Sequence, residues 1–147
     1  MNREKIIKQR GEIVDKFVNI EWIINAIICQ HYFGKVMINF VLEALYDEYF
    51  SFALKRRIIE KIFPEIDKSK LGDLNRLNNI RNYFAHCTDG LFIGKKSEGE
   101  YVPDPRNHSK PLNFDLLHSE FIEKEKEVNK YLYKLYLSIG GEAFIDE

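Results

Sequence analysis

The residues best suited to chemistry lie in one short stretch, Arg81-Asn82-Tyr83-Phe84-Ala85-His86. An arginine holds a phosphate or a carboxylate through two parallel hydrogen bonds, and a histidine takes up or releases a proton near neutral pH. Arg81 and His86 are five residues apart, which on a regular helix is a rotation of about 140°. They therefore do not share a helix face, and a site that uses both must be built from more than one helix or more than one copy of the chain.

The stretch ends a predicted helix over residues 71–85. Four polar residues follow one another at spacings of four, three and four: Asn75, Asn79, Asn82 and His86. These spacings place them in one polar line along the helix. Arg81 falls instead between Leu77 and Phe84, at the apolar face. An unpaired buried charge is costly, so we expect Arg81 either to pair with an acid inside the fold or to reach an interface.

Glu21 is the acid expected to pair with Arg81. It lies four residues after Phe17 and three before Ile24, on the apolar stripe of a predicted first helix. In one interpretation the pair is only a structural ion pair. In the other, Glu21 supports Arg81 from behind in a site that uses the arginine.

Helical periodicity dominates the rest of the chain. Four main helices are predicted, over about residues 3–33, 35–63, 71–85 and 114–139. Gly34 and Pro64 mark the ends of the first two, and Asn113 is the expected N-cap of the last. The fold class predicted is all-α, an up-and-down bundle of four main helices forming a single domain over residues 1–147.

An insertion of different character precedes the last helix. Residues 87–113 hold three glycines and three of the four prolines of the chain. They predict a long loop or a small hairpin that pairs residues 91–93 with residues 100–102. Long loops inside compact domains are uncommon and are usually functional or disordered, and this one follows the motif directly.

Composition limits the classes of partner. The net charge is −1, so bulk attraction to nucleic acid is excluded and any such contact needs a local patch. A run of basic residues offers one candidate patch, although a solvated helix face is the competing interpretation: Lys55, Arg56, Arg57, Lys61, Lys68 and Lys70. No apolar run reaches the roughly 18 residues of a membrane span. Two cysteines without metal-ligand spacing favour a reduced cytoplasm, and we expect no metal and no cofactor.

The residues Leu77–His86 resemble the signature of the HEPN superfamily (higher eukaryotes and prokaryotes nucleotide-binding domains). That signature is an Arg, usually followed by Asn or another polar residue, with a His four to six residues beyond the Arg. Two long N-terminal helices, the motif on the third and a closing helix also resemble the family, so the likeness covers most of the chain. The insertion 87–113 has no counterpart in the minimal family fold.

The resemblance implies a metal-independent endoribonuclease that works in toxin, defence or stress systems. It implies a homodimer with the site at the subunit interface, RNA as substrate, and an antitoxin or another regulatory partner. Arg81 and His86 would be catalytic, and Asn82, Asn78 and Asn79 would bind or orient the substrate. The alternative is a non-catalytic module of the same fold that binds a nucleotide or a protein partner. In that case Arg81 would be locked to Glu21 and His86 would be closed off from solvent. Taken alone, His86 has a further interpretation, in which it only stabilises the end of its helix.

One residue departs from the family pattern. In the toxin branch silenced by a partner nucleotidyltransferase, the modified residue is usually a Tyr two positions after the His. That position is Thr88 here. Control by that modification is therefore not expected, unless Thr88 or the nearby Tyr83 takes the place of that Tyr.

Overall fold

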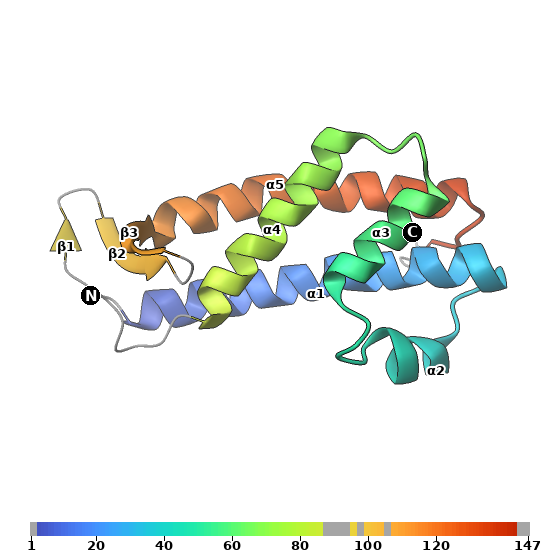
Figure 1. Ribbon diagram of the computed structural model, residues 1–147, viewed down its shortest axis with the longest axis horizontal. Helices are drawn as coiled ribbons and strands as arrows, with labels where there is room; N and C mark the ends of the chain where they lie inside the picture. The colour runs from blue at the N-terminus through green and yellow to red at the C-terminus, as the bar shows by residue number, and fades with distance from the viewer. Residues whose placement is uncertain (1–2, 87–94, 97–98, 105–106, 144–147) are drawn as a thin grey trace. The chain divides into compact units, whose positions relative to one another are not determined.

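The computed structural model describes residues 3–86, 95–96, 99–104 and 107–143. Figure 1 follows its elements from the N-terminus in blue to the C-terminal part in red. In chain order they are helices α1 (Arg3–Phe33) and α2 (Ile38–Phe40), the π-helical turn η1 (Val41–Leu45), helices α3 (Phe52–Ile62) and α4 (Lys68–His86), strands β1 (Lys95–Lys96), β2 (Gly99–Asp104) and β3 (Asn107–Asn113), and helix α5 (Phe114–Ser138). The predicted all-α class is confirmed, with a small sheet inserted before the last helix.

The predicted helix ends are largely confirmed. Gly34 and Gly140 both have a positive φ, 73° and 89°, a conformation that ends helices and favours glycine. Asn113 caps α5, because its Oδ1 accepts a hydrogen bond from the Leu116 amide at 3.1 Å. The second predicted helix, 35–63, is wrong as one element, since it is broken between η1 and α3.

Two local hydrogen bonds explain that break. The Asp47 carboxylate accepts from the Tyr49 amide at 2.9 Å, and Ser51 caps α3 by accepting from the Leu54 amide at 3.1 Å. Short polar side chains that bind nearby amides compete with helix continuation. The apolar spacing carries on across residues 46–51, but the backbone does not remain helical there.

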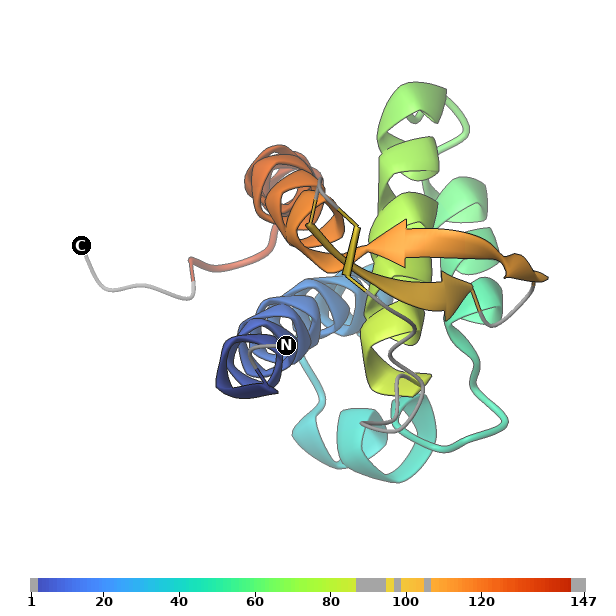
Figure 2. The ribbon, with the colours of Figure 1, turned by 90° about the vertical axis from the view of Figure 1, so that its left-hand side faces the viewer.

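The sheet in the insertion has the order β1-β2-β3 with antiparallel neighbours. Figure 2 shows β2 and β3 as adjacent arrows, with β3 leading into α5. Tyr101 pairs with Asn113, and Glu100 pairs with Lys95. The predicted partner segment, residues 91–93, lies outside the described residues.

Two compact units divide the contacts of the chain. The first unit is Met1–Val18 with Asp73–Lys126, and the second is Asn19–Gly72 with Glu127–Glu147. The single domain over residues 1–147 stays a prediction. Across the described ranges, no helix combines the length and the apolar character that a membrane crossing requires.

Each unit has its own apolar interior. In the first, α1, α4 and α5 contribute buried side chains that include Phe17, Phe84 and Phe114, and the rings of Phe84 and Phe114 lie 4.6 Å apart. In the second, isoleucines of α1 are buried with Leu45, Ile59 and other residues of η1, α3 and α5. Burial of this kind stabilises each unit by removing apolar surface from water.

Candidate functional site

Helix α4 positions the predicted motif in the first unit. Its apolar face is fixed by Leu77, Ile80 and Phe84, none of which has exposed surface. Arg81 follows Ile80 at the edge of this face, and its side chain is partly exposed. The anchoring of α4 through three buried side chains therefore also determines where Arg81 lies.

Asn78 and Phe17 both contact the Arg81 guanidinium. Its Nη2 donates a hydrogen bond to Asn78 Oδ1 at 2.7 Å. Its central carbon lies 4.4 Å from the centroid of the Phe17 ring, which comes from α1 and is buried. The amide fixes one edge of the guanidinium and the ring fixes its plane. A side chain ordered in advance loses less conformational entropy when a ligand binds.

His86 is the last residue of α4, and its side chain is exposed. Beside it, Arg10 Nε donates a hydrogen bond to the backbone oxygen of Phe84 at 2.9 Å. This bond satisfies a carbonyl of the last helical turn and ties the end of α4 to α1. The imidazole is thus carried on an anchored helix end and can exchange protons with water. The helix dipole also stabilises a protonated histidine at this end. The interpretation in which His86 only stabilises the helix end therefore remains.

The structure keeps Arg81 and His86 on one continuous helix. Their five-residue separation therefore remains a rotation of about 140° around α4. Within a single copy of the chain, α4 does not bring the two side chains onto one face.

The three predicted asparagines are all partly exposed, but they differ in position. Asn78 accepts a hydrogen bond from Arg81 and so orients the arginine. Asn82 is four residues before His86 and shares its face of the helix. Asn79 precedes Asn82 by three residues on the same line. The structure therefore divides the set into one residue beside Arg81 and two on the His86 side.

Glu21 lies in the second unit, whereas Arg81 lies in the first. The Arg81–Glu21 pair therefore stays a prediction. Within its own unit, Glu21 pairs with Lys55, whose Nζ lies 4.0 Å from the carboxylate. Sequence reasoning did not propose this pair.

Lys55 is a cation inside the second unit. Its side chain is 3% exposed, and its Nζ lies 5.1 Å from the centroid of the Tyr46 ring. A signal for this burial exists in the sequence, because Lys55 is three residues after Phe52 and four before Ile59 on the apolar stripe of α3. The turn η1 helps to place Tyr46, whose amide donates to the Val41 oxygen at 3.0 Å.

Burial and charge shift the titration of this group of residues. Burial lowers the pKa of Lys55, and the Glu21 carboxylate acts in the opposite direction. Burial also raises the pKa of the Tyr46 hydroxyl, and the Glu21 carboxylate raises it further. The arrangement joins α1 to α3 through a charge pair that is largely withdrawn from water.

The predicted basic strip is wrong in one member, because Lys55 is buried. Arg57, Lys61 and Lys68 are exposed. The Lys68 ammonium lies 3.5 Å from the Glu60 carboxylate, so part of the positive charge is locally opposed. These residues form a solvated helix surface with a reduced positive charge.

Comparison with known proteins adds no further assignment to this geometry. No family model, no curated protein and no solved structure matches the chain. The function must therefore be argued from the side chains themselves. In the part of the chain that the structure describes, no three His, Cys, Asp or Glu side chains are grouped so that they could hold a metal ion.

Proposed function

We propose that this chain is a metal-independent endoribonuclease of the HEPN type, acting in a toxin, defence or stress system. The observation that carries the proposal is the ordered Arg81, held by Asn78 and the Phe17 ring on the helix that ends in the exposed His86. A planar guanidinium fixed before binding suits a phosphate, which accepts two of its hydrogen bonds. A histidine supplies proton transfer near neutral pH.

The substrate carries its own nucleophile. The 2′-oxygen of a ribose attacks the adjacent phosphorus, the new O–P bond forms, and the bond from phosphorus to the 5′-oxygen breaks. One His86 takes the proton from the 2′-hydroxyl, and a second His86 donates a proton to the leaving 5′-oxygen. Arg81 donates to the non-bridging oxygens and opposes the charge that develops there. The products are a 2′,3′-cyclic phosphate end and a 5′-hydroxyl end.

A homodimer supplies the second histidine and overcomes the offset of about 140° between Arg81 and His86. An exposed apolar line on α1 in the first unit supports the dimer, with Ile7, Val14 and Val18 at 50%, 38% and 51% exposure. Gly11 lies on the same line. Beyond its own helix backbone and chain neighbours, no described residue would come within 4 Å of a Cβ at this position, which leaves room for close approach by another helix. In this dimer Asn82 orients the phosphate or the imidazole.

The non-catalytic alternative requires His86 to be closed off from solvent. The exposure of His86 supports the enzyme instead. We also propose that the protein acts in the cytoplasm and that a regulatory or antitoxin partner restrains it. Purification of the chain together with its native partners tests that part of the proposal.

The function is tested by incubating mixed RNAs with the protein in the presence of a chelator. Arg81→Ala and His86→Ala should each lower the cleavage rate by about 10²- to 10⁴-fold, the range typical of a removed proton-transfer group or charge stabiliser. His31→Ala is the matched control, because His31 is also an exposed histidine in the last turn of a helix. It should cut as the parent does, and the active species should sediment as a dimer.

Two outcomes contradict the proposal at different levels. If both variants cut as fast as the parent, the assignment of Arg81 and His86 is wrong. If the parent itself cuts no RNA under these conditions, the enzyme proposal fails. A strictly monomeric active species would remove the shared site.

A further inference from the structure

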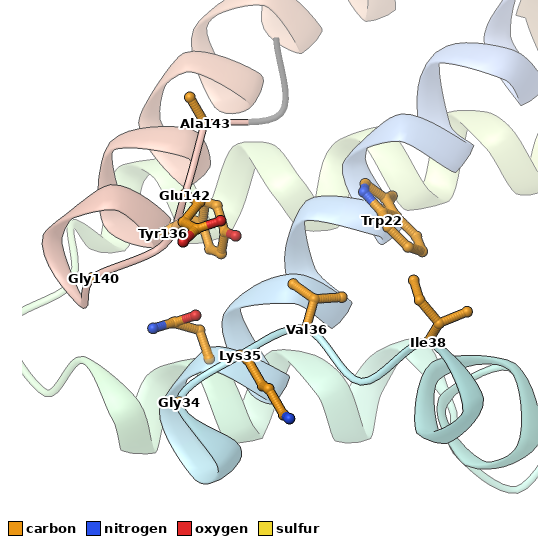
Figure 3. Close-up of a pocket in the computed structure, with 10 residues that line it drawn as sticks. Trp22, Gly34, Lys35, Val36, Ile38, Tyr136, Gly140, Glu142 and Ala143 are labelled. Atoms are coloured by element: carbon orange, nitrogen blue, oxygen red, sulfur yellow. The ribbon is translucent and has the colours of Figure 1, made fainter. Parts of the chain in front are cut away.

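The second unit contains a pocket of about 400 Å³ that the proposed nuclease does not use. This volume lies in the range of small-molecule sites, about 300–1,000 Å³. Figure 3 shows its walls, which come from α1, the segment after it, α2 and the end of α5. A ligand for this pocket must therefore be inferred from the residues that line it.

Two helices end at this pocket. Gly34 follows α1 and Gly140 follows α5, and both line the cavity. The amide of Gly34 donates to the Gln30 oxygen at 3.0 Å, and the amide of Gly140 donates to the Leu137 oxygen at 3.1 Å. The C-terminus of a helix carries a partial negative charge from its last carbonyls. Two such ends at one cavity favour a positively charged occupant.

Gly141 allows the chain to pass closely over a tyrosine. A Cβ on Gly141 would overlap the Tyr136 ring, so a larger residue would displace the ring or the chain. The close passage brings Glu142 to the hydroxyl of Tyr136. The Glu142 carboxylate and the burial of the ring raise the pKa of that hydroxyl, and burial is the larger cause. This end of the pocket is therefore acidic.

The opposite end is apolar. Trp22, Val36 and Ile38 form it, and Figure 3 shows them apart from the end that carries Tyr136 and Glu142. The Lys35 side chain also lines the pocket, but in Figure 3 its ammonium points away from Glu142. The cavity thus has an aromatic and aliphatic end and a separate end with negative charge.

We propose that this pocket binds a small organic amine, with its apolar body against Trp22 and its ammonium at Glu142. The indole face attracts a neighbouring apolar or cationic group. The carboxylate and the two helix C-termini carry negative charge and attract the ammonium. The site is independent of the proposed nuclease chemistry. It requires neither Arg81 nor His86.

Trp22 provides the measurement, because it is the only tryptophan in the chain. Its fluorescence is followed while 2-phenylethylamine is added, with excitation at a wavelength that the phenyl ring does not absorb. A saturable change in emission is expected. Two probes of the same shape serve as controls: neutral 2-phenylethanol and anionic 3-phenylpropionate. Each should bind at least about tenfold more weakly, the factor that corresponds to about 1.4 kcal/mol.

A pair of variants isolates the carboxylate. Glu142→Gln should weaken 2-phenylethylamine about threefold to fivefold, the range for a charge pair at an exposed carboxylate. It should leave 2-phenylethanol unchanged, since only the amine carries a charge. Glu127→Gln is the matched control, an exposed glutamate on α5 in the same unit, and should bind as the parent does. Absence of any emission change overturns the proposal. So does equal affinity for the amine and the carboxylate probe, or an unchanged affinity in Glu142→Gln.

Discussion

Each unit holds one cation against an aromatic ring, and the two cations are in different surroundings. In the first unit, the Arg81 guanidinium lies 4.4 Å from the Phe17 ring centroid and remains partly exposed. In the second, the Lys55 ammonium lies 5.1 Å from the Tyr46 ring centroid, and its side chain is 3% exposed. The Phe17 ring beneath Arg81 is buried, whereas the Tyr46 residue beside Lys55 is 42% exposed.

The difference in exposure means that the Arg81 guanidinium can bind a ligand, whereas the Lys55 ammonium holds helices together. Arg81 has five N–H donors in a rigid plane, and partial exposure leaves part of that plane accessible. Lys55 is a compact charge that has lost most of its hydration, and the Glu21 carboxylate opposes it inside the same unit. Similar cation–ring contacts therefore carry different roles, and exposure distinguishes them.

The largest expected effect concerns stability and Lys55. Replacement by methionine removes the ammonium beside Glu21 and gives a side chain one atom shorter than that of lysine. Lys55→Met should lower the free energy of unfolding by about 3 kcal/mol, the low end for a broken buried pair, because Glu21 retains some exposure. Urea denaturation measures it. Lys61→Met, an exposed lysine on the same helix, should cost less than about 0.5 kcal/mol.

If Lys55→Met and Lys61→Met unfold at the same urea concentration, Lys55 is not a structural cation and the contrast with Arg81 disappears. Cleavage of RNA by the folded fraction of Lys55→Met should equal that of the parent. A specific loss of cleavage there would place Lys55 in the site.

The next effect concerns activity and the support of Arg81, and it rests on the proposed nuclease. Asn78→Ala removes the oxygen that fixes Nη2 of Arg81. A hydrogen bond to a charged group contributes about 1.5–3 kcal/mol, and partial exposure brings this toward the low end. We expect kcat/KM for RNA to fall about tenfold. The free energy of unfolding should fall by no more than about 1.5 kcal/mol, the contribution of the lost hydrogen bond.

Asn75→Ala is the control for Asn78→Ala. Asn75 is a partly exposed asparagine on α4, three residues earlier. It should retain the activity of the parent. Equal losses in both variants would mean that the asparagines act on the helix in general, and an unchanged Asn78→Ala would mean that Arg81 needs no such support.

The sequence predicted those parts of the structure that local chemistry determines. The bounds of α1, the Asn113 cap and the glycine at the end of α5 follow from periodicity and from short polar or flexible residues. The break before α3 was missed because Asp47 and Ser51 look like ordinary polar positions until their amide partners are known.

Side-chain partners were harder to predict than helices. Arg81 was expected at the edge of the apolar face, and it lies there against Phe17. That Asn78 holds it depends on a choice of rotamer, which spacing alone does not fix. Lys55 was assigned to a charged run, although its position on the apolar stripe of α3 pointed inward. A run of basic residues suggests an exposed surface, even when one of them lies at helical spacing from core residues and is therefore buried.

The smallest effect concerns an exposed ion pair, which extends the comparison from buried to accessible charges. A hydrogen bond from Lys5 lowers the pKa of Asp115, and a second from Gln9 adds to this; the two distances are 2.8 and 2.9 Å. Because the pKa is lower in the folded state than its ordinary value of 3.8, the contribution to stability is present above that value and is lost as the pH falls below it.

Asp115→Asn should therefore be less stable than the parent at neutral pH, by about 0.5 kcal/mol or less because the Asp115 side chain is 45% exposed. The difference should shrink on acidification to about pH 3, as the carboxylate in the parent becomes protonated. Urea denaturation at both pH values measures it, with Asp15→Asn as the control for an exposed aspartate on α1. A difference that widens on acidification would mean that burial rather than Lys5 dominates this carboxylate, and Asp115 would then resemble Lys55 instead of an accessible charge.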